Sequence, residues 1–598
     1  MRDQSPSVVS DAGTEARYRA VPAEIYDVNG QLSLAASESC AASVPLGARS
    51  AAVLRHCLAE RSLREHADHA ARALGIGSGR ELDSELAMLA RAGLLRRIDW
   101  TKRTSAPTGP TPAAEIRTVA ILTADRPNYL ARCLQSYLDH LTASGTEARL
   151  LVVDHSRTPA HSRDTERHVV AAAASAHQSI QYAGEQSRQS LRERALAAGF
   201  AAGVIDWLMP SEPPNRSAGS GRNHVLLLTA GEPVLMADDD TVCTVWRHEE
   251  ADDDIAFVGH NDPNDMRVFH DRTSAIAAIQ RTTDGLLAAH QALLGCRLAD
   301  LAVRGSRDTT HVCRHLTPVF EGLRPAWTVR ATWAGLAGDA GTYCPYPLLF
   351  HAGPARDRLA AADNLATALA SREVVRSVRR PTVTDEPWFM TYCAAVDGST
   401  LLPPFSPVGT NEDGLFGAML RMCDPTAFIG QIPYGVVHDS GRLSPYDLGV
   451  IPSASSVRLA DLVRWVSAAW TAACVETDVS TRMRGLGRHL MACGRLEPSA
   501  WRAHLTRLIV DARRRVLIAT QSVLDDGFPY PAPWRQAIGQ YQQAVLDCVT
   551  SADACVPVEY RSCPSAEAAA DAVQEYFRRL GEALVVWPDL WQLCRDPA

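Results

Sequence analysis

Residues 217–241 read SAGSGRNHVLLLTAGEPVLMADDDT, and this stretch decides the fold of the chain. Residues 234–237 form a short, continuous apolar run, which is typical of a fully buried strand in a parallel sheet. Asp238, Asp239 and Asp240 follow at its carboxyl end, where open α/β sheets bind their ligands. We therefore predict an α/β protein with a ligand site at this strand end.

The three aspartates suggest a divalent cation. Adjacent carboxylates raise one another's pKa unless a cation neutralises them, so Asp238 and Asp240 suit Mn²⁺ or Mg²⁺ bridging a diphosphate, with Asp239 pointing elsewhere. The alternative is a solvated acidic turn. Residues 249–254 are equally acidic, but no apolar run precedes them, and we interpret them as a charged loop.

Composition limits the class of protein. The 598 residues suffice for roughly three or four domains. A net charge of −8 argues against a general nucleic-acid or membrane-surface binder. Charged residues and glycines interrupt the apolar stretches well before the roughly 18 residues that a membrane span needs. The fifteen cysteines are scattered and no signal peptide is recognisable, so we expect free thiols in a cytoplasmic protein.

The first 105 residues have the pattern of a small winged-helix-like α+β domain. We expect strands at 17–23 and 31–35, followed by helices at 48–58, 63–74 and 82–93. Residues 106–115 are rich in proline and small polar residues and predict a linker.

The phrases PLGARSAAVLRHC (45–57) and LDSELAMLARAGLLRR (82–97) resemble PqqD-like peptide-recognition domains. This resemblance implies that a leader peptide adds as a strand to an exposed sheet edge. A structural appendage and a DNA-binding winged helix are the alternatives. The near balance of acidic and basic residues in this region speaks against DNA.

Residues 116–240 predict the start of a doubly wound sheet. Strands are expected at 118–123 and 150–153, with a helix between them whose apolar residues recur every four positions. Polar residues follow each strand, Asp125 and Arg126 after the first and Asp154 after the second. This arrangement is one βαβ unit.

Three segments resemble the family 2 glycosyltransferases of the GT-A fold, a Rossmann-like nucleotide-diphospho-sugar transferase fold. They are TADRPNYLARCLQSYL (123–138), VVDHS (152–156), and GSGRN (219–223) with the AGE and aspartates that follow. By position, the resemblance assigns the donor to Thr123, Asp125, Arg126, Asp154, Arg222, Asn223, Asp238 and Asp239, and the metal to Asp238 and Asp240. His155 stands where the family usually has a second Asp, so the resemblance does not say which nucleotide base the donor carries. Asp125 or Asp154 as a cap and Arg222 as a surface ion pair are the alternatives.

Two later segments complete the resemblance. The segment PPFSPVGTNEDGLFGAMLRMC (403–423) matches the family's ED motif before a helix, so Asp413 is assigned as the catalytic base and Glu412 as its neighbour. Their alternative role is a helix N-terminus with favourable dipole placement. His438 follows an expected strand at 432–437 and is assigned as a third metal ligand, the alternative being a structural histidine.

The remaining segments carry weaker signals. Residues 241–380 match no motif, although we expect a Gly-rich turn at 335–341 (GLAGDAG) and note the histidines of HVCRH at 311–315, a weak zinc candidate. A strand is expected at 388–395. Residues 453–598 predict an all-α domain, with amphipathic helices at 501–519 and 573–580 that pack a core or form a homodimer or peptide-docking surface.

Together these patterns predict a GT-A domain at 116–452 between the two flanking domains. The expected activity is metal-dependent, inverting transfer of a sugar from a nucleotide-sugar, a UDP-sugar above all, to a Ser, Thr or Cys side chain of a ribosomally made peptide. Transfer to a cell-envelope glycan or small natural product is one alternative. A peptide-binding protein with a degenerate GT-A domain is the other.

Overall fold

The chain folds into two compact units. The computed structural model describes residues 17–20, 24–27, 31–36, 44–57, 61–77, 80–98, 114–210, 217–258, 263–298, 300–301, 327–342, 345–351, 353–361, 364–442, 445–446, 455–525, 527–550 and 556–596. The smaller unit comprises Met1–Pro110, Ile255–His260 and Leu298–Pro325, and the larger unit comprises the rest. The segment HVCRH lies outside the described residues.

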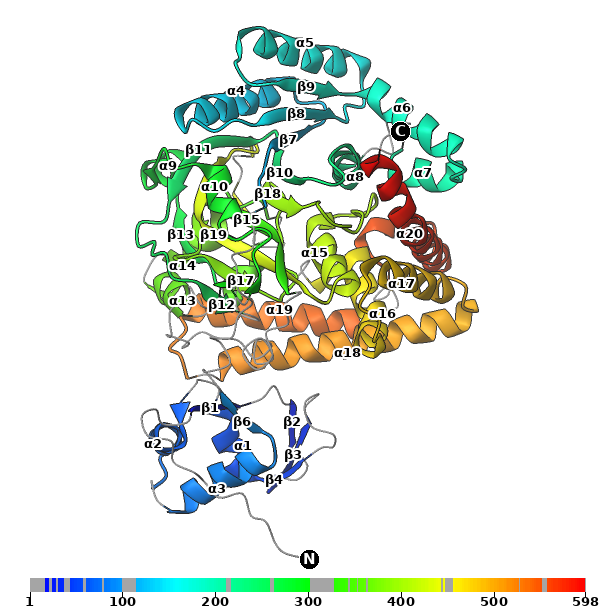
Figure 1. Ribbon diagram of the computed structural model, residues 1–598. Helices are drawn as coiled ribbons and strands as arrows, with labels where there is room; N and C mark the ends of the chain where they lie inside the picture. The colour runs from blue at the N-terminus through cyan, green and yellow to red at the C-terminus, as the bar shows by residue number, and fades with distance from the viewer. Residues whose placement is uncertain are drawn as a thin grey trace, which may run out of the picture. The chain divides into compact units, whose positions relative to one another are not determined.

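The described residues of the smaller unit form two small sheets and the helices α1, α2 and α3 around them (Figure 1). Its elements are β1 (Arg17–Ala20), β2 (Glu24–Asp27), β3 (Leu32–Ala36), β4 (Val44–Gly47), α1 (Ala48–Arg55), β5 (Arg61–Ser62), α2 (Leu63–Leu74), α3 (Arg80–Arg91) and β6 (Leu95–Ile98), and the segment 255–260 carries β12 (Ala256–Val258). The sheets have the orders β5-β1-β6 and β2-β3-β4. The expected helices are confirmed. The strands expected at 17–23 and 31–35 are found as β1 and β3, whereas β2 was not expected.

Local chemistry explains the bounds of α2. Ser62 accepts a hydrogen bond from the Glu65 backbone N–H at 3.2 Å, and the Glu65 carboxylate accepts one from the Ser62 N–H at 2.7 Å. This capping box satisfies two orphan donors of the first turn. Gly75 ends the helix in the left-handed conformation, at φ 64°.

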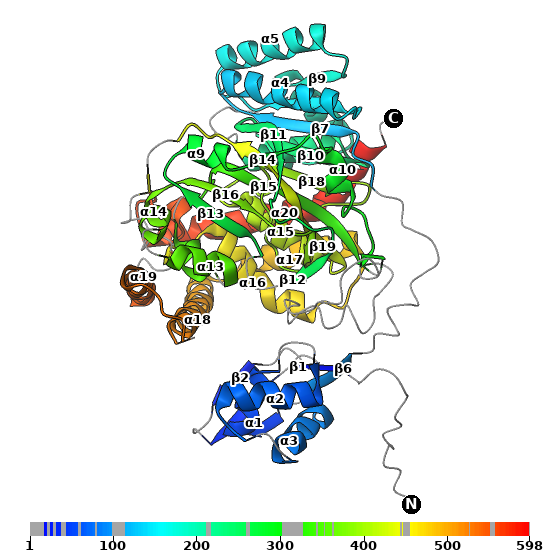
Figure 2. The same cartoon turned by 90° about the vertical axis from the view of Figure 1, so that its left-hand side faces the viewer.

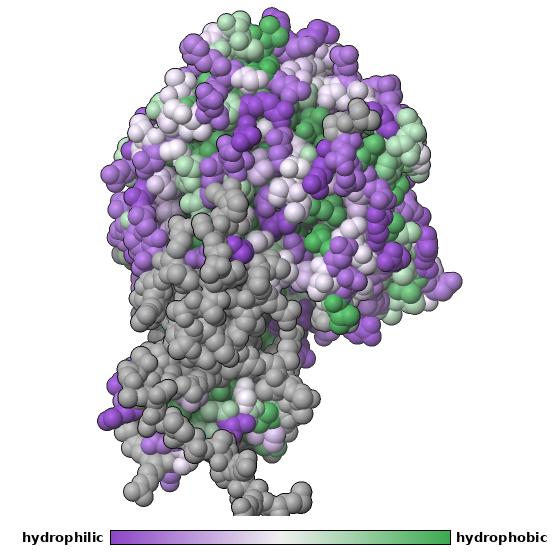
Figure 3. Space-filling model, in the orientation of Figure 1, coloured by the Kyte–Doolittle hydropathy of each residue, from purple (hydrophilic) through white to green (hydrophobic). Residues whose placement is uncertain are grey.

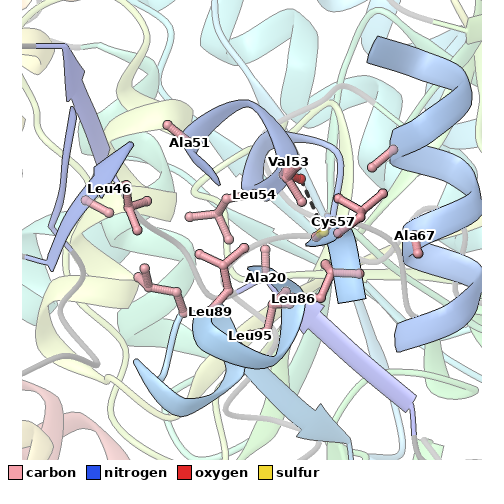
Figure 4. Close-up of a cluster of buried hydrophobic side chains, with 14 of the residues drawn as sticks. Ala20, Leu46, Ala51, Val53, Leu54, Cys57, Ala67, Leu86, Leu89 and Leu95 are labelled. Atoms are coloured by element: carbon pink, nitrogen blue, oxygen red, sulfur yellow. Dashed lines mark hydrogen bonds between the residues drawn. The ribbon is translucent and has the colours of Figure 1, made fainter. Parts of the chain in front are cut away.

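Apolar side chains from the helices α1, α2 and α3 meet in one core (Figure 4). Leu54 of α1 and Leu86 and Leu89 of α3 are buried there beside Leu95 of β6. Cys57 follows α1, and its thiol donates to the Val53 carbonyl oxygen at 3.2 Å (Figure 4). Burial raises the pKa of Cys57 to about 12, so this thiol is a core group rather than a nucleophile.

The larger unit is a mixed α/β structure with one large sheet and many helices (Figures 1 and 2). Its strands are β7 (Thr118–Thr123), β8 (Arg149–Asp154), β9 (Ile180–Ala183), β10 (Pro233–Asp238), β11 (Thr241–Arg247), β13 (Asp265–Phe269), β14 (Gln280–Arg281), β15 (Thr328–Asp339), β16 (Glu373–Ser377), β17 (Thr382–Thr384), β18 (Cys393–Asp397) and β19 (Ala427–His438). Its helices up to α15 are α4 (Pro127–Ala143), α5 (Pro159–Ser175), α6 (Glu185–Ala197), α7 (Ala202–Leu208), α8 (Ala218–Leu228), α9 (Arg272–Ala277), α10 (Leu286–Gln291), the 3-10 helix η4 (Tyr346–Phe350), α13 (Gly353–Ala360), α14 (Asn364–Ala370) and α15 (Glu412–Cys423).

The first half of this sheet is parallel and runs in the order β9-β8-β7-β10. This matches the first four positions of the strand order 3-2-1-4-5-6 of a doubly wound sheet. The interiors of β7, β8 and β10 are almost wholly buried, as their continuous apolar sequences predicted. The βαβ unit expected over 118–153 is thereby confirmed.

The second half of the sheet places two later strand ends at the same edge. β18 runs antiparallel to both β10 and β15, and β19 runs parallel to β15. β7, β8, β10, β15 and β19 therefore all point the same way. Asp238, Asp339 and His438, the last residues of three of them, lie at one edge of the sheet.

The Gly-rich turn expected at 335–341 was wrong, because residues 335–339 form the end of β15. Glycine is needed there for close backbone approach rather than for a turn. A Cβ at Gly335 would lie 2.5 Å from the Arg376 carbonyl oxygen, and one at Gly338, whose φ is 115°, would lie 2.4 Å from that of His438. The strand expected at 388–395 begins only at Cys393.

The C-terminal helices belong to the larger unit. They are α16 (Leu459–Ala473), α17 (Val479–Cys493), α18 (Pro498–Leu524), α19 (Ala532–Thr550), the 3-10 helix η8 (Val558–Tyr560) and α20 (Ala566–Arg595). α17 packs along α20, α18 along α19, and α15 against α16 and α17 (Figures 1 and 2). Among the described residues, no helix combines the length and apolar character that crossing a membrane requires.

The surface of the larger unit mixes hydrophilic and hydrophobic residues on the face drawn in Figure 3. Large exposed apolar side chains are spread over different elements, such as Val170 on α5, Val475 after α16 and Val510 on α18. Scattered apolar residues of this kind are normal on a protein surface. The homodimer through the C-terminal helices stays a prediction.

Candidate active site at the carboxyl edge of the sheet

Asp238, Asp239 and Asp240, called the Asp run below, connect the strands β10 and β11. Asp238 ends β10, and β11 begins at Thr241 and pairs antiparallel with β19, with Thr241 opposite His438. The Asp439 backbone N–H donates to the Asp240 carbonyl oxygen at 2.7 Å. This pairing holds the end of β19 against the Asp run, although about 200 residues separate them in the sequence.

Arg222 joins the Asp run to the Glu412–Asp413 pair. Its guanidinium donates to both carboxylate oxygens of Asp238, at 2.8 and 3.0 Å, and to Glu412 Oε1 at 2.6 Å. The Arg222 side chain is only 5% exposed. Burial opposes its charge, but the carboxylates of Asp238 and Glu412 outweigh that effect and raise its pKa. One buried cation thus joins Asp238, which the resemblance assigns to the metal, to Glu412, which it places beside the base.

Asp239 and Asp240 share a second arginine. Arg126 Nη1 donates to Asp240 Oδ2 at 2.9 Å, and Arg126 Nη2 forms an ion pair with Asp239 Oδ1. The Thr123 hydroxyl at the end of β7 donates to Asp239 Oδ2 at 2.7 Å. Burial raises the pKa of Asp239 to about 7, against the opposing effect of Arg126. Asp239 therefore points toward β7, away from the direction of Asp238, as the alternation of a strand tip predicted.

His438 lies beside Asp240. The imidazole Nε2 is 3.4 Å from Asp240 Oδ1, and Nδ1 donates to the Asp339 carbonyl oxygen at 2.7 Å. Burial lowers the pKa of His438, but the Asp240 carboxylate dominates and raises it to about 9. The same contact, together with Arg126, holds the pKa of Asp240 well below its usual range, although burial acts in the opposite direction.

Glu412 and Asp413 open α15. Asn411 precedes them in the left-handed conformation, at φ 64°, and its side chain makes no capping hydrogen bond. Asp413 Oδ1 accepts from the Gly414 backbone N–H at 2.8 Å. Burial and the neighbouring Glu412 carboxylate raise the pKa of Asp413 to about 6, while Arg222 acts to lower it. An aspartate with such a pKa is a stronger base near neutral pH than an ordinary one.

Asp125 is held by the start of α5. Its backbone adopts φ 58°, which is uncommon for a residue other than glycine. Its carboxylate accepts from the Arg157 backbone N–H at 2.8 Å and from Arg157 Nε at 2.6 Å. Burial acts to raise the pKa of Asp125, but hydrogen bonds from Arg157 and His161 lower it. Its predicted contact with the donor stays a prediction.

Asp154 is buried at the end of β8. Its Oδ1 accepts from the Ser156 backbone N–H and its Oδ2 from the Tyr182 hydroxyl, each at 2.8 Å. His155 is also buried and faces the His224 ring, with the ring centroids 5.7 Å apart. The structure thus places Asp125 and Asp154 at neighbouring strand ends, each with its carboxylate engaged by protein groups.

Asn223 fastens α8 to the segment before α15. Its side-chain oxygen accepts from the Phe405 backbone N–H at 2.7 Å, and its side-chain nitrogen donates to the carbonyl oxygens of Phe405 and Leu208, at 3.0 and 3.2 Å. Asn223 is fully buried, and these three bonds use most of what its amide offers. The structure gives Asn223 a fastening role, and its contact with the donor stays a prediction.

The sequence interpretation missed Asp339 and the groups around it. Asp339 is fully buried at the end of β15, where its carboxylate accepts from Arg372 Nη2 at 3.0 Å and from the Ser440 hydroxyl. Burial raises its pKa, but Ser440 and the Gly341 N–H hold it below the usual range. Its position at the end of a strand could have indicated Asp339, but the glycines of 335–341 led us to predict a turn instead of a strand.

Asp439 was also missed, although it follows His438 directly. Its carboxylate accepts from Arg132 Nη1 at 2.5 Å and forms an ion pair with Arg272. Arg272 in turn donates to both oxygens of Glu373, at 2.5 and 2.9 Å for Nε and Nη2. This chain of charges borders the site beside His438.

The pair of Asp240 and His438 fits a divalent cation. Metal-binding histidines generally donate the second ring nitrogen to a carbonyl or carboxylate. His438 does so through Nδ1, so Nε2, which faces Asp240, is the nitrogen that a cation would bind in place of a proton. Asp238 instead faces Arg222, and in the described part of the chain no three His, Cys, Asp or Glu side chains converge as a ready metal cage. Mg²⁺-type sites often use one or two protein ligands and complete the shell with phosphate and water.

Comparisons with known proteins give little guidance. No protein-family model matches the chain, and no curated protein matches it. One similar solved structure is "Mannosyltransferase PcManGT from Pyrobaculum calidifontis in complex with GDP-Man and Mn2+", at 13% identity and a TM-score of 0.29, over 75% of this chain and 92% of that chain. At that level of superposition the likeness carries no weight for the site, whose interpretation rests on its own geometry.

Proposed function

We propose that this chain is a metal-dependent, inverting glycosyltransferase that uses a nucleotide-sugar donor, with a UDP-sugar expected first. The observation that carries the proposal is that the guanidinium of Arg222 bonds both Asp238 and Glu412, the residue directly before Asp413. The site lies at the carboxyl edge of a sheet with the order β9-β8-β7-β10, where α/β sheets bind nucleotides. The sequence resemblance to family 2 glycosyltransferases points to the same chemistry.

Asp240 and His438 would hold the cation, with Asp238 joining them if Arg222 turns to the donor. When bound, Mn²⁺ or Mg²⁺ would neutralise the charge that develops on the diphosphate leaving group. Arg126, whose side chain is 40% exposed, has the reach to exchange Asp240 for a phosphate oxygen. The positive groups needed to bind a diphosphate are therefore already gathered at the Asp run.

Asp413 would act as the base. Its carboxylate accepts the proton of the acceptor hydroxyl or thiol while the acceptor atom forms a bond to the anomeric carbon. The bond from that carbon to the diphosphate oxygen breaks on the opposite face, which inverts the configuration. Glu412 would keep Arg222 in place, and its negative charge keeps the pKa of Asp413 raised.

The pH dependence of kcat/KM tests the role of Asp413. We expect kcat/KM to fall as pH drops below about 6, because protonated Asp413 cannot accept a proton. Glu412→Gln should move this acid limb to lower pH, since it removes the like charge and leaves Arg222 to act on Asp413. A pH–rate profile that is identical in the two proteins would contradict the assignment of the limb to Asp413.

We propose that the acceptor is a Ser, Thr or Cys side chain of a ribosomally made peptide, recruited by the smaller unit. The support is its element order, a three-stranded sheet followed by three helices, which matches the pattern behind the PqqD-like resemblance. In the sheet β2-β3-β4, the outer strands β2 and β4 offer edges for strand addition. Titration of a leader peptide against the full chain and against a chain lacking residues 1–105 tests this. Equal affinities would reject peptide recruitment.

The activity itself is tested by incubating the chain with nucleotide-sugars, Mn²⁺ and a peptide encoded beside this protein. Release of the nucleoside diphosphate together with a sugar-sized mass gain on the peptide supports the proposal. Release accompanied by sugar transfer only to glycan or small-molecule acceptors would replace the peptide by another acceptor. Peptide binding without turnover of any donor would identify a binding protein with a degenerate catalytic domain.

A further inference from the structure

The segment that leads into α15 is buried but irregular. Residues 401–411 have no helix or strand, yet 402–407 are all buried. Buried backbone outside regular structure has to find hydrogen-bond partners elsewhere. Pro403, Pro404 and Pro407 lack an N–H and reduce that demand. The remaining groups depend on side chains from two other parts of the fold.

α8 supplies one set of anchors. Asn223 bonds both backbone groups of Phe405, and the Ser217 hydroxyl donates to the Pro407 carbonyl oxygen at 2.8 Å. A Cβ at Gly219 would lie 1.9 Å from the Ser406 carbonyl oxygen, so only glycine permits this approach. The segment therefore rests directly on the first turn of α8.

α20 supplies the second set. The Trp587 indole Nε1 donates to the Leu402 carbonyl oxygen at 2.7 Å, and both residues are fully buried. Ser406 Oγ donates its proton to the Val408 carbonyl oxygen at 2.7 Å, so the Tyr576 hydroxyl, 3.0 Å away, is the donor to Ser406. Tyr576 and Trp587, which lie about three helical turns apart on α20, thus hold the two ends of the buried segment 402–407.

The 3-10 helix η8 contacts the same segment at Thr410, three residues before Asp413. Glu559 Oε2 accepts from the Leu459 backbone N–H at 3.1 Å, and its Oε1 lies 3.5 Å from the Thr410 backbone nitrogen. Gly409, at φ 95°, would bring a Cβ within 3.1 Å of Glu559 Oε1. Glu559 therefore ties the last residues before Asn411 to the start of α16.

From these contacts we infer that the C-terminal helices are part of the catalytic apparatus: Trp587, Tyr576 and Glu559 are positioning residues that fix where α15, and with it Asp413, begins. The inference rests on the proposed function and gives the C-terminal segment a role beyond core packing. Phe405 carries the constraint onward, because its ring stacks on Phe416 of α15 at a centroid distance of 4.1 Å.

Trp587→Phe tests the inference with a matched control. It removes the indole donor, whereas Trp501→Phe makes the same change at another fully buried tryptophan whose Nε1 meets no hydrogen-bond partner in the described part of the chain. Hydrogen exchange of the peptide 402–411 should quicken in Trp587→Phe and stay unchanged in Trp501→Phe. Tyr576→Phe, which removes one hydroxyl, is the milder second variant and should quicken exchange around Val408.

Turnover distinguishes a positioning role from a purely structural one, because only the former predicts a loss of kcat at unchanged KM. We expect Trp587→Phe to lower kcat about 10- to 100-fold with the KM for the donor unchanged, because a small displacement of a base is enough for such a loss. Trp501→Phe should keep the wild-type kcat. Equal losses in both variants, or neither loss nor faster exchange in Trp587→Phe and Tyr576→Phe, overturn the inference. If the wild-type chain turns over no donor, the proposed function fails, and the exchange measurement alone decides whether α20 anchors the segment.

Discussion

Replacing Arg222 by methionine is expected to destabilise the larger unit by about 3–5 kcal/mol, because Asp238 and Glu412 lose the one cation that bonds them both. Removing one partner of a buried ion pair leaves its charges without compensation, and here two carboxylates are affected. The melting temperature of the larger unit, measured by scanning calorimetry, should fall by several degrees. Adding Glu412→Gln to Arg222→Met should restore part of the loss, since it removes one of the stranded charges.

Arg149→Met is the matched control for this change. Arg149 bonds Glu232 at 2.7 Å, but both side chains are more than a third exposed. Exposed pairs contribute about 0–1 kcal/mol, so the expected change in melting temperature is small. If Arg222→Met melts no lower than Arg149→Met, then Arg222 does not hold the two acidic groups together as described.

Asp413→Asn is expected to lower kcat by about 10²- to 10⁴-fold, the usual contribution of a general base, while leaving the affinity for the donor unchanged. The amide keeps the shape of the side chain but cannot take up the acceptor's proton. The measurement is steady-state kinetics at saturating donor and acceptor, with donor affinity determined separately by calorimetry.

The alternative for Asp413 predicts a different result. A carboxylate that only favours the N-terminus of α15 contributes about 0.3–1 kcal/mol to stability, so Asp413→Asn would then lower the melting temperature slightly and leave kcat intact. The same outcome, with the loss of kcat appearing instead in Glu412→Gln, would move the role of base to Glu412.

Local signals in the sequence were enough for the elements that build the site. The apolar run at 118–123 predicted β7 with its bounds, and the run at 234–237 predicted β10 to within one residue at each end. Both strands are buried on both faces, so their sequences are continuous apolar segments. The βαβ pattern then located the ligand edge, since strand ends meet there in any parallel sheet.

Contacts between distant segments were not predictable in the same way. Nothing in the sequence near Arg222 indicates that Glu412 will share its guanidinium, because that contact depends on how α8 and α15 pack. Likewise, Asn223 looks like a polar residue available to a ligand, but its amide is taken up by the backbone of Phe405 and Leu208. The residue type in a motif determines which hydrogen bonds and ion pairs a side chain can form, and tertiary packing determines which groups become its partners.

Glycine caused the clearest error. Three glycines near one another normally indicate a turn, yet Gly335 and Gly338 lie in β15, where neighbouring strands approach too closely for a side chain. The mistake also hid Asp339, whose carbonyl oxygen orients His438. Residues 241–380, which match no motif, supply β11, β15 and β16 to the sheet, so the second half of the fold depends on pairings over long sequence distances.

The central claim is that the Asp run binds a divalent cation and a nucleotide-sugar. The most direct test is to measure by calorimetry how a nucleoside diphosphate binds, with and without Mn²⁺, to wild type, Asp240→Asn and Asp253→Asn. Asp253 is the control, because it belongs to the acidic loop at 249–254 and its side chain is 95% exposed. We predict that Mn²⁺ strengthens binding to wild type and to Asp253→Asn, and that Asp240→Asn loses the effect of Mn²⁺. Binding that is equally Mn²⁺-dependent in all three proteins, or independent of Mn²⁺ in wild type, would contradict the claim.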